Sequence, residues 1–296
     1  MFAVEKYHKA QTVAEAVRLL AADPFAVPIA GGTDILVKLR EGHREYANLV
    51  DIHAMPELTP ITLEPDGSLA VGAGATFTQI IESELVQRHS PVLAEGASWV
   101  AGPQIRNVGT VGGNICNGSV CADSVPPLLV LDAELELQGP EGLRRIPLRG
   151  FHTGPGKVAC GHAEVLTRII VPAAPTGGAF GAASIKYAMR QAMDITTIGC
   201  AASILLENDR ITWLKLAFSV AAPTPVRCPV AEAAALGKPL DAATIAAVQD
   251  AVAADVSPRT SWRAPADFRL HIIRELAARA IDKAAARSAQ PGRSPA

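Results

Sequence analysis

The sequence predicts an α+β fold, and three observations lead to that class. Segments with helical and with strand-like apolar periodicity alternate as far as Val171. The segment from Pro172 to Gly178 then breaks both patterns with proline, glycine and small residues. Beyond it, strand-like segments come first and helical segments follow, an order typical of α+β proteins. We therefore expect one domain over residues 1–175 and a second over 179–286, followed by a disordered tail at 287–296.

Composition excludes several classes of function. The chain has 296 residues, of which 49% are apolar and 19% charged, with a formal net charge of −2. This balance lacks the basic field that nucleic acids or anionic membranes attract. No apolar stretch reaches the ~18–20 residues that a bilayer crossing needs, and no apolar run follows a basic start. We expect a cytoplasmic protein that binds neither nucleic acid nor membrane.

The cysteines favour reduced thiols over a metal site or disulfides. There are five of them, irregularly spaced and without a Cys-x-x-Cys pair. Only Cys116 and Cys121 are close in sequence, and an iron–sulfur site there would need ligands from elsewhere in the chain. We expect free cytosolic thiols and no metal.

The N-terminal domain is expected to mix short helices and strands, with a subdomain boundary after about residue 58. Thr12-Val-Ala-Glu15 has the form of a capping box and opens the first helix. A turn at Gly139-Pro-Glu-Gly142 joins two alternating segments into a hairpin. The remaining expected strands are 26–30, 47–52, 69–75 and 164–171, and the remaining helices are 35–39, 76–86, 91–100 and a short one after Ser124.

The C-terminal domain is expected to begin with antiparallel strands at 184–188, 197–206 and 211–220. The last two are joined by a tight turn at Glu207-Asn-Asp-Arg210. Helices are expected at about 230–236, 241–254 and 267–285.

The stretch from Gly109 to Asp123 is the most distinctive in the chain. Gly112 and Gly113 leave two successive residues without a β-carbon, so the backbone could turn sharply and lie against a ligand. Backbone amides beside a helix N-terminus suit an anion such as a pyrophosphate. An ordinary glycine-rich turn between strand and helix explains the same residue types equally well. The short polar side chains around the pair are Thr110, Asn114, Asn117 and Ser119.

A second glycine pair repeats this layout near the N-terminus. Gly31-Gly32-Thr33-Asp34 follows a predicted strand and precedes a predicted helix. Either a second anion-binding turn or a plain strand–helix turn fits. The pattern is not Gly-x-Gly-x-x-Gly, and no Walker A motif occurs, so the usual dinucleotide and P-loop motifs are absent.

Taken together, these segments resemble the FAD-binding subunit of the xanthine dehydrogenase family. The enzymes of this family are molybdenum hydroxylases. The resemblance covers about residues 1–285 and is nearest to the separate medium subunit of the bacterial enzymes. The motifs that carry it are Ala30-Gly-Gly-Thr-Asp-Ile35, Gly102-Pro-Gln-Ile-Arg-Asn107, Thr110-Val-Gly-Gly-Asn114, Ala122-Asp123, Phe151-His-Thr-Gly-Pro-Gly-Lys157, Lys186-Tyr-Ala-Met-Arg190, Met193-Asp-Ile-Thr-Thr-Ile-Gly199, Leu216-Ala-Phe-Ser-Val-Ala-Ala-Pro-Thr-Pro225 and Trp262-Arg263.

The resemblance implies a two-subdomain FAD-binding domain of the vanillyl-alcohol-oxidase-like (PCMH) type. It also implies a C-terminal domain like that of the CO dehydrogenase flavoprotein, with a three-stranded antiparallel sheet and helices. No histidine or cysteine is placed for covalent attachment, so FAD should be non-covalent. No inserted cysteine loop for a 4Fe–4S cluster is visible.

The resemblance also implies cofactor-binding residues, and it assigns no catalytic acid or base. Asn117 and Val100 depart from the family pattern, so no contact is carried over to them. The FAD diphosphate would lie against a first loop formed by Ile29, Ala30, Gly31, Gly32, Thr33, Asp34, Ile35 and Leu36. A second loop would contribute Thr110, Val111, Gly112, Gly113 and Asn114, with Asp123 at the ribityl–pyrophosphate region, Leu166 as an apolar contact and Lys186 near the isoalloxazine edge.

The implied activity is electron transfer. Electrons would come from 2Fe–2S clusters in a partner subunit and pass through FAD to NAD during purine hydroxylation at a molybdopterin-binding subunit. The complex would be a dimer of heterotrimers. A related hydroxylase acting on carbon monoxide, an aldehyde or an aromatic thioester is the alternative. A flavin-free scaffold is a third, which the two intact glycine pairs disfavour.

A few side chains outside the motifs carry open interpretations. Loop residues His152 and His162 are either solvated or proton-transfer groups. Arg106 either neutralises a phosphate or anchors its loop. We expect the segment from Lys186 to Thr197 to form the wall of a nicotinamide site, with Gly177 to Ala183 allowing it to move. The three tryptophans, Trp99, Trp213 and Trp262, are expected to pack rather than to stack on a ligand.

Overall fold

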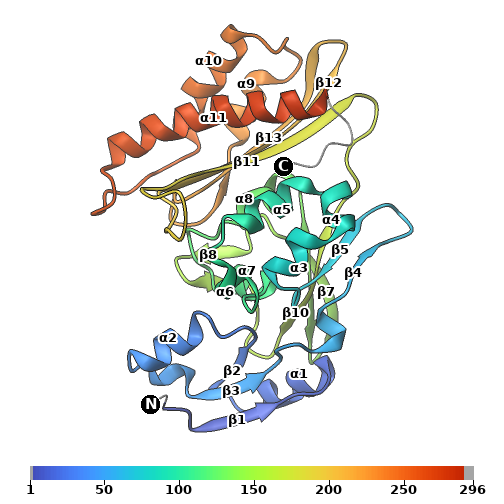
Figure 1. Cartoon of the computed structure of the whole chain (residues 1–296), viewed down its shortest axis with the longest axis vertical. Coiled ribbons are helices and arrows are strands. Elements are labelled where there is room, and N and C mark those ends of the chain that lie inside the picture. Colours follow the sequence, from blue (N-terminus) through green and yellow to red (C-terminus); the bar gives the residue numbers. More distant parts are fainter. Residues whose placement is uncertain (1–2, 290–296) are drawn as a thin grey trace.

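A computed structural model describes residues 3–289 as a mixed α+β structure, which confirms the predicted fold class. Three groups of elements follow one another along the long axis of the molecule (Figure 1). A small three-stranded sheet lies at the N-terminal end, a five-stranded sheet with helices lies in the middle, and a four-stranded sheet with three helices lies at the other end. The candidate site lies along the junctions that the middle group forms with the other two.

The first sheet has parallel strands in the order β1 (Lys6–Lys9), β3 (Asn48–Asp51) and β2 (Ala26–Ile29). Helix α1 (Val13–Ala22) begins at Thr12, whose side chain accepts from the Glu15 amide at 3.1 Å, as the capping pattern predicts. Its buried face is Val13, Ala16, Val17 and Leu20. Helix α2 (Ile35–Arg40) follows β2, and a 3-10 turn (Arg44–Tyr46) leads into β3.

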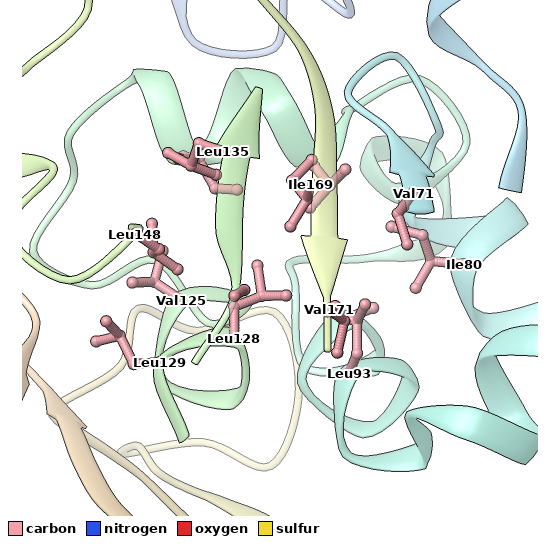
Figure 2. Close-up of a cluster of buried hydrophobic side chains, with 14 of the residues drawn as sticks. Val71, Ile80, Leu93, Val125, Leu128, Leu129, Leu135, Leu148, Ile169 and Val171 are labelled. Carbon is pink, nitrogen blue, oxygen red and sulfur yellow. The ribbon is translucent and has the colours of Figure 1, made fainter. Parts of the chain in front are cut away.

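The second sheet is antiparallel, in the order β4 (Ile61–Leu63), β5 (Leu69–Gly72), β10 (Val165–Val171), β6 (Glu134–Gly139) and β7 (Gly142–Pro147). Its core is shared with α3 (Phe77–Glu82), α4 (Glu84–His89), α5 (Pro91–Ser98), α7 (Val111–Cys116) and α8 (Val125–Val130). Figure 2 shows Val71, Leu135 and Ile169 of the sheet among Leu93 and Leu128 of the helices. Short elements α6 (Pro103–Arg106), β8 (His152–Gly154) and β9 (Lys157–Val158) complete this part, with a 3-10 turn (Pro56–Leu58) before β4.

The third sheet runs β11 (Ala179–Tyr187), β12 (Ile198–Glu207), β13 (Arg210–Ser219) and β14 (Val226–Arg227), all antiparallel. Helix α11 (Ala266–Ser288) crosses β11 and β12, while α9 (Pro229–Ala235), α10 (Ala242–Ala251) and a 3-10 turn (Val252–Ala254) complete the layer (Figure 1). The predicted tight turn is confirmed, because Asn208 and Asp209 both have positive φ, 49° and 60°, between β12 and β13.

Several expectations about this half of the chain are wrong. The sheet has four strands instead of three, because Val226–Arg227 pairs with β13. Strand β11 starts at Ala179, so most of the expected hinge from Gly177 to Ala183 is hydrogen-bonded to β12. Helix α11 continues to Ser288, so the first residues of the expected disordered tail are helical, while 290–296 lie outside the described residues.

Two expectations in the N-terminal half also fail. The single helix expected over 76–86 is two helices, because Ser83 has an extended ψ of 117° and caps α4 through the Val86 amide. The glycine-rich stretch after Gly109 is not an open turn, because Val111–Cys116 forms α7. Strand β1 was not expected at all.

Candidate cofactor-binding site

The two predicted glycine loops meet in the structure. A β-carbon added at Gly31 would overlap the carbonyl oxygen of Val108 and lie 3.0 Å from the Gly109 Cα. Lys38 in α2 spans the same junction, with Nζ 2.9 Å from Asp34 and 3.2 Å from Asn117 Oδ1. Only a glycine at position 31 therefore lets the β2–α2 loop approach the backbone that leads into α7 this closely.

The β2–α2 loop presents a row of free backbone donors. Among residues 3–289, no acceptor is hydrogen-bonded to the amides of Ala30, Gly31, Gly32, Thr33 or Asp34. Gly32 has a φ of +69°, the left-handed conformation that redirects the chain there. Backbone N–H groups need a partner, and successive free amides in a turn form an anion-binding concavity. This loop therefore fits the diphosphate of FAD.

The second loop is built differently from the sequence-based expectation. Thr110 caps α7 by accepting from the Gly113 amide at 3.1 Å. The Val111 and Gly112 amides donate to Ala75 O and Ala73 O, at 3.1 and 2.8 Å. The first-turn amides of α7 thus already have acceptors in the protein, and the longer row of free donors lies in the first loop.

The two glycines of α7 face different surroundings. A β-carbon at Gly112 would lie 2.6 Å from Ala73 Cβ and 2.7 Å from Ala73 O, so glycine is needed for helix packing. A β-carbon at Gly113 would meet only Thr110 Oγ1, at 2.9 Å, within the described residues. Gly113 therefore lies on the open face of α7, where a ligand can approach.

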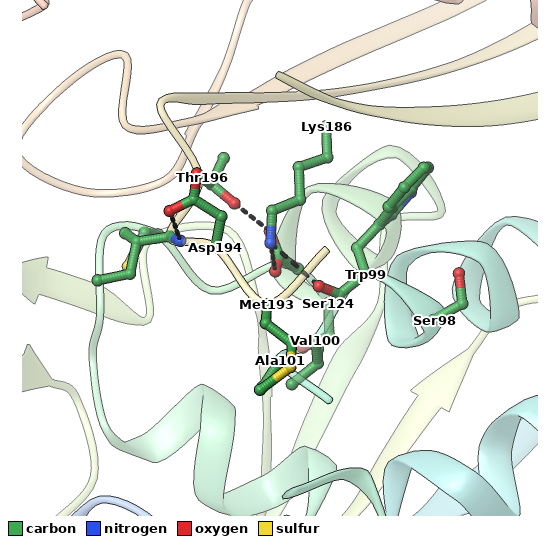
Figure 3. Close-up of polar contacts among 12 residues, drawn as sticks. Ser98, Trp99, Val100, Ala101, Ser124, Lys186, Met193, Asp194 and Thr196 are labelled. Atoms are coloured by element: carbon green, nitrogen blue, oxygen red, sulfur yellow. Dashed lines mark hydrogen bonds and ion pairs between the residues drawn. The ribbon is translucent and has the colours of Figure 1, made fainter. Parts of the chain in front are cut away.

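Asp123 and Lys186 form a largely buried ion pair. Figure 3 shows the Lys186 side chain reaching the region between Thr196 and Trp99. Lys186 Nζ lies 2.8 Å from Asp123 Oδ2, and the two side chains are 9% and 11% exposed. Lys186 also donates to Trp99 O at 3.0 Å, and Thr196 Oγ1 donates to the other Asp123 oxygen. Burial raises the pKa of Asp123, against the opposing effect of Lys186.

Lys186 also lines a cleft of about 740 Å³ between α5–α6 and the loop from β11 to β12. The far wall is the segment 187–194, which exposes Met189 and Met193, and Figure 3 shows Met193 near Ala101. On the other wall lies Arg106, which donates to Val100 O at 2.8 Å and to Ala101 O at 3.2 Å. These two bonds support the interpretation in which Arg106 anchors its loop over the one in which it neutralises a phosphate.

Other sequence-predicted groups lie elsewhere. Leu166 is buried in the core with α7, and its site role stays a prediction. His152 is buried, not solvated: its Nε2 lies 3.1 Å from Ile115 O, and burial lowers its pKa. His162 is exposed and binds Leu20 O and Asp23 O at the end of α1.

The tryptophans follow the packing expectation only in part. Trp213 donates to Ser203 Oγ at 3.1 Å and supports Lys215 over its ring, whereas Trp99 lines the cleft. Trp262 is 78% exposed beside Arg263, so the packing expectation is wrong there. Sequence reasoning also missed Lys38 and the side chain of Thr196, although Thr196 belongs to a motif of the resemblance.

No set of three potential metal-ligating side chains is clustered within residues 3–289. Among the helices of that range, none has both the length and the apolar composition needed to cross a bilayer.

Comparison with known protein families shows to which family the chain belongs. Residues 2–174 match the FAD binding domain in molybdopterin dehydrogenase. The chain belongs to the molybdopterin dehydrogenase FAD-binding family. Residues 183–284 match the CO dehydrogenase flavoprotein C-terminal domain. The family predicted by the sequence motifs is thereby confirmed.

Individual members of this family match over nearly the whole chain. The xanthine dehydrogenase FAD-binding subunit of Escherichia coli O157:H7 is 51% identical over 286 residues, covering 97% of this chain and 98% of that one. The carbon monoxide dehydrogenase medium chain of Hydrogenophaga pseudoflava is 32% identical, covering 96% and 98%. A solved structure of carbon monoxide dehydrogenase from the same organism superposes with a TM-score of 0.92 at 33% identity, covering 97% and 99%.

Proposed function

We propose that the chain is the FAD-binding electron-transfer subunit of a xanthine dehydrogenase. It would receive electrons from 2Fe–2S clusters in one partner subunit and deliver them to NAD, while a molybdopterin-binding subunit hydroxylates hypoxanthine or xanthine. Support comes from the 51% identity to a relative with that name, against 32% to a carbon monoxide dehydrogenase subunit. The whole assembly would be a dimer of heterotrimers.

The observation that carries FAD binding is the row of free amides from Ala30 to Asp34. We propose that Ile29 to Leu36 hold the diphosphate, because these donors would replace the water that the anion loses. The glycine at position 31 keeps this loop against Val108 and Gly109. Thr110 to Asn114 would line the neighbouring face, with Gly113 leaving space for the cofactor.

The remaining proposed contacts lie toward the cleft. Asp123 would bind near the ribityl–pyrophosphate region, and Leu166 would contribute an apolar contact. Lys186 would lie near the isoalloxazine edge, held in place by Asp123 and by Trp99 O. The cleft beside Lys186 would admit the nicotinamide. When bound, FAD supplies the exchange between one-electron and two-electron transfer.

Three further proposals rest on the sequence. FAD would be bound without a covalent link. The chain would be divided at 1–175 and 179–286, with subdomains of about 1–58 and 59–175. Its location would be the cytoplasm.

The test of FAD binding is a titration of the purified chain. We expect one FAD per chain, a yellow protein, and complete release of the flavin into the supernatant after acid precipitation. Flavin retained in the pellet would refute the non-covalent link, and a colourless protein that FAD does not titrate would favour the scaffold alternative.

The test of the electron path compares the chain alone with the chain plus its proposed partners. The FAD-loaded chain alone should reduce an artificial dye with NADH, since this half-reaction needs only FAD and an open nicotinamide face. It should not reduce NAD with xanthine until the other two subunits are added. Xanthine turnover by this chain alone would refute the three-subunit arrangement, and absence of dye reduction would indicate an acceptor other than NAD.

A flavin subunit of a related hydroxylase is the second candidate, favoured by the match to the carbon monoxide dehydrogenase medium chain. Carbon monoxide, aldehydes and aromatic thioesters are its substrate classes. If the reconstituted complex turns over one of these substrates and does not turn over xanthine, the second candidate function is the correct one.

A further inference from the structure

Lys38 joins three separate segments at the junction between the two glycine loops. Its Nζ forms an ion pair with Asp34 Oδ2 at 2.9 Å, at the start of α2. It also donates to Asn117 Oδ1 at the C-terminal end of α7, at 3.2 Å, and to Tyr46 OH in the 3-10 turn before β3, at 3.4 Å. The same ammonium lies 4.9 Å from the centroid of the Tyr46 ring. The three N–H donors of Lys38 are thus matched by three protein oxygens.

Asp34 occupies the N-cap position of α2, but its carboxylate does not cap the helix. An aspartate at this position commonly accepts a hydrogen bond from an amide of the first helical turn. Asp34 makes no such bond, and its Oδ2 pairs instead with Lys38, one turn further along. The side chains of Asp34 and Lys38 are 53% and 33% exposed, so the pair lies at the surface of the junction. Lys38, and not the helix, therefore balances the charge of this carboxylate.

The Asp34 carboxylate belongs to the segment that offers the free backbone donors. The amide of Asp34 is the last in the row that begins at Ala30. A carboxylate beside an anion site repels the anion, and a cation paired with the carboxylate reduces that repulsion. Burial alone would lower the pKa of Lys38, but its contacts with Asp34 and Tyr46 raise it, so the lysine stays charged.

We propose that Lys38 is a positioning residue for a diphosphate bound at the β2–α2 loop. It neutralises the Asp34 carboxylate beside the row of free amides and, through Asn117, holds that loop against α7. It acts through Asp34, because its own N–H donors already have acceptors in the protein. The inference rests on the proposed FAD site and deepens it, since it assigns the side chain that makes this loop acceptable to an anion.

The test is a fluorescence titration of the purified, flavin-free chain with FAD. Lys38→Met removes the charge with little change in side-chain length, so it should raise the Kd for FAD about tenfold. Arg40→Met is the matched control, because Arg40 lies in the same helix, is exposed and has no ion-pair or hydrogen-bond partner within residues 3–289. It removes the same unit of charge and should change the Kd by less than about twofold.

The double variant Asp34→Asn/Lys38→Met distinguishes neutralisation from direct contact with the phosphate. It removes the unpaired carboxylate and keeps every backbone amide, so it should bind FAD at least about threefold more tightly than Lys38→Met. Lys38→Arg keeps the positive charge and should also bind more tightly than Lys38→Met. If Lys38 contacted the phosphate itself, or served only to hold the fold together, removing the Asp34 charge would not restore affinity.

Folding is measured separately from affinity, by far-UV circular dichroism and urea unfolding of each flavin-free variant. Lys38→Gln is titrated in place of Lys38→Met if the methionine variant folds poorly. If wild type binds FAD and Lys38→Met binds it equally tightly, the inference alone is refuted. A double variant that binds no more tightly than Lys38→Met would refute neutralisation of Asp34. A wild-type chain that does not bind FAD would refute the proposed function and this inference with it.

Discussion

Lys186 of β11 and Asp123, just before α8, join the C-terminal sheet to the middle layer through a 2.8 Å ion pair. Lys186 also lines the cleft, and Ser124, which follows Asp123, donates to Asn114 Oδ1 of α7 at 2.7 Å. Each ion has further partners, Trp99 O for the lysine and Thr196 for the aspartate. Hydrogen bonding of this kind is what offsets the desolvation of a buried pair.

The first prediction is that Lys186→Met destabilises the chain most at high pH. It leaves the Asp123 carboxylate buried without its cation, which should lower the unfolding free energy by about 3 kcal/mol near pH 7. Burial then raises the pKa of Asp123 against the Thr196 hydrogen bond alone. A carboxyl whose pKa is higher in the folded state stabilises that state below its unfolded pKa, and this contribution is lost as pH rises through the folded pKa. Urea unfolding at pH 5 and pH 8 measures the difference.

The double variant Asp123→Asn/Lys186→Met provides the control. It removes both charges, so it should recover part of the stability and lose the extra pH dependence. A Lys186→Met protein whose destabilisation is the same at both pH values would show that the carboxylate is not the cause.

A second prediction concerns Glu95 of α5. It accepts from the Ser184 amide at 2.8 Å and pairs with Lys283 and Arg287 of α11 at 2.6 and 2.7 Å. Glu95→Gln should lower the unfolding free energy by about 2 kcal/mol, less than for a fully buried pair because Lys283 is partly exposed. As a control, the exposed side chain of Glu82 has no hydrogen-bond partner within residues 3–289, so Glu82→Gln should change stability by less than about 0.5 kcal/mol.

The pH dependence of the Glu95 variant has the opposite sign to that of Lys186→Met. Burial alone would raise the pKa of Glu95, but the hydrogen bonds from Arg287 and Lys283 hold it below its usual value. The stability that ionised Glu95 contributes is therefore present above its unfolded pKa and is lost as pH falls through its folded pKa. Wild type and Glu95→Gln should converge in stability on acidification, and a constant gap down to pH 3 would contradict the assignment.

The third prediction concerns the hairpin between β12 and β13. Asp209 has a φ of 60°, a left-handed backbone conformation that is higher in energy for any residue with a β-carbon. Asp209→Gly completes the Asn-Gly pair preferred in such turns and should raise the unfolding free energy by roughly 0.5–1 kcal/mol. Asp209→Ala should lower it. A thermal melt of the two variants beside wild type measures both, and equal effects would argue against strain in this turn.

Local sequence patterns predicted elements whose signal lies within a single segment. The apolar spacing and cap of α1, and the alternation of apolar and polar residues in β6, are properties of those segments alone. Strand β1 is polar and exposed along its length and becomes a strand only by pairing with β3. Helix α7 contains two glycines, which disfavour helices, and its first amides depend on Ala73 and Ala75 in another part of the chain.

In the candidate site, too, some features were predictable from single segments and others depend on tertiary packing. Glycine pairs in two loops suggested an anion site, and the resemblance supplied their common ligand. The contact between Gly31 and Val108, and the pairing of Lys186 with Asp123, arise from tertiary packing that no local pattern contains. For that reason the sequence placed free amides at both glycine pairs, whereas in the structure the amides of Gly112 and Gly113 are hydrogen-bonded to other protein groups and those of Gly31 and Gly32 are not.

The last prediction separates packing from cofactor binding within α7. Gly112→Ala forces a β-carbon against Ala73 and should lower the unfolding free energy by about 1–3 kcal/mol. In the described residues, a β-carbon at Gly113 meets only the Thr110 hydroxyl, at 2.9 Å, so Gly113→Val should disturb the cap of α7 while the far-UV circular dichroism stays near wild type. If the cofactor lies over this face, its branched side chain should weaken FAD binding by at least about tenfold, or roughly 1.4 kcal/mol.

Flavin fluorescence titration measures the affinity of each variant, and urea unfolding measures its stability without FAD. Asp123→Ala should weaken FAD binding less than Gly113→Val, because it removes a polar contact and leaves the space open. Gly113→Val with unchanged FAD affinity would place the cofactor away from α7. Gly112→Ala with wild-type stability would show instead that the helix can move away from Ala73, so that the glycine pair serves the ligand and not the packing.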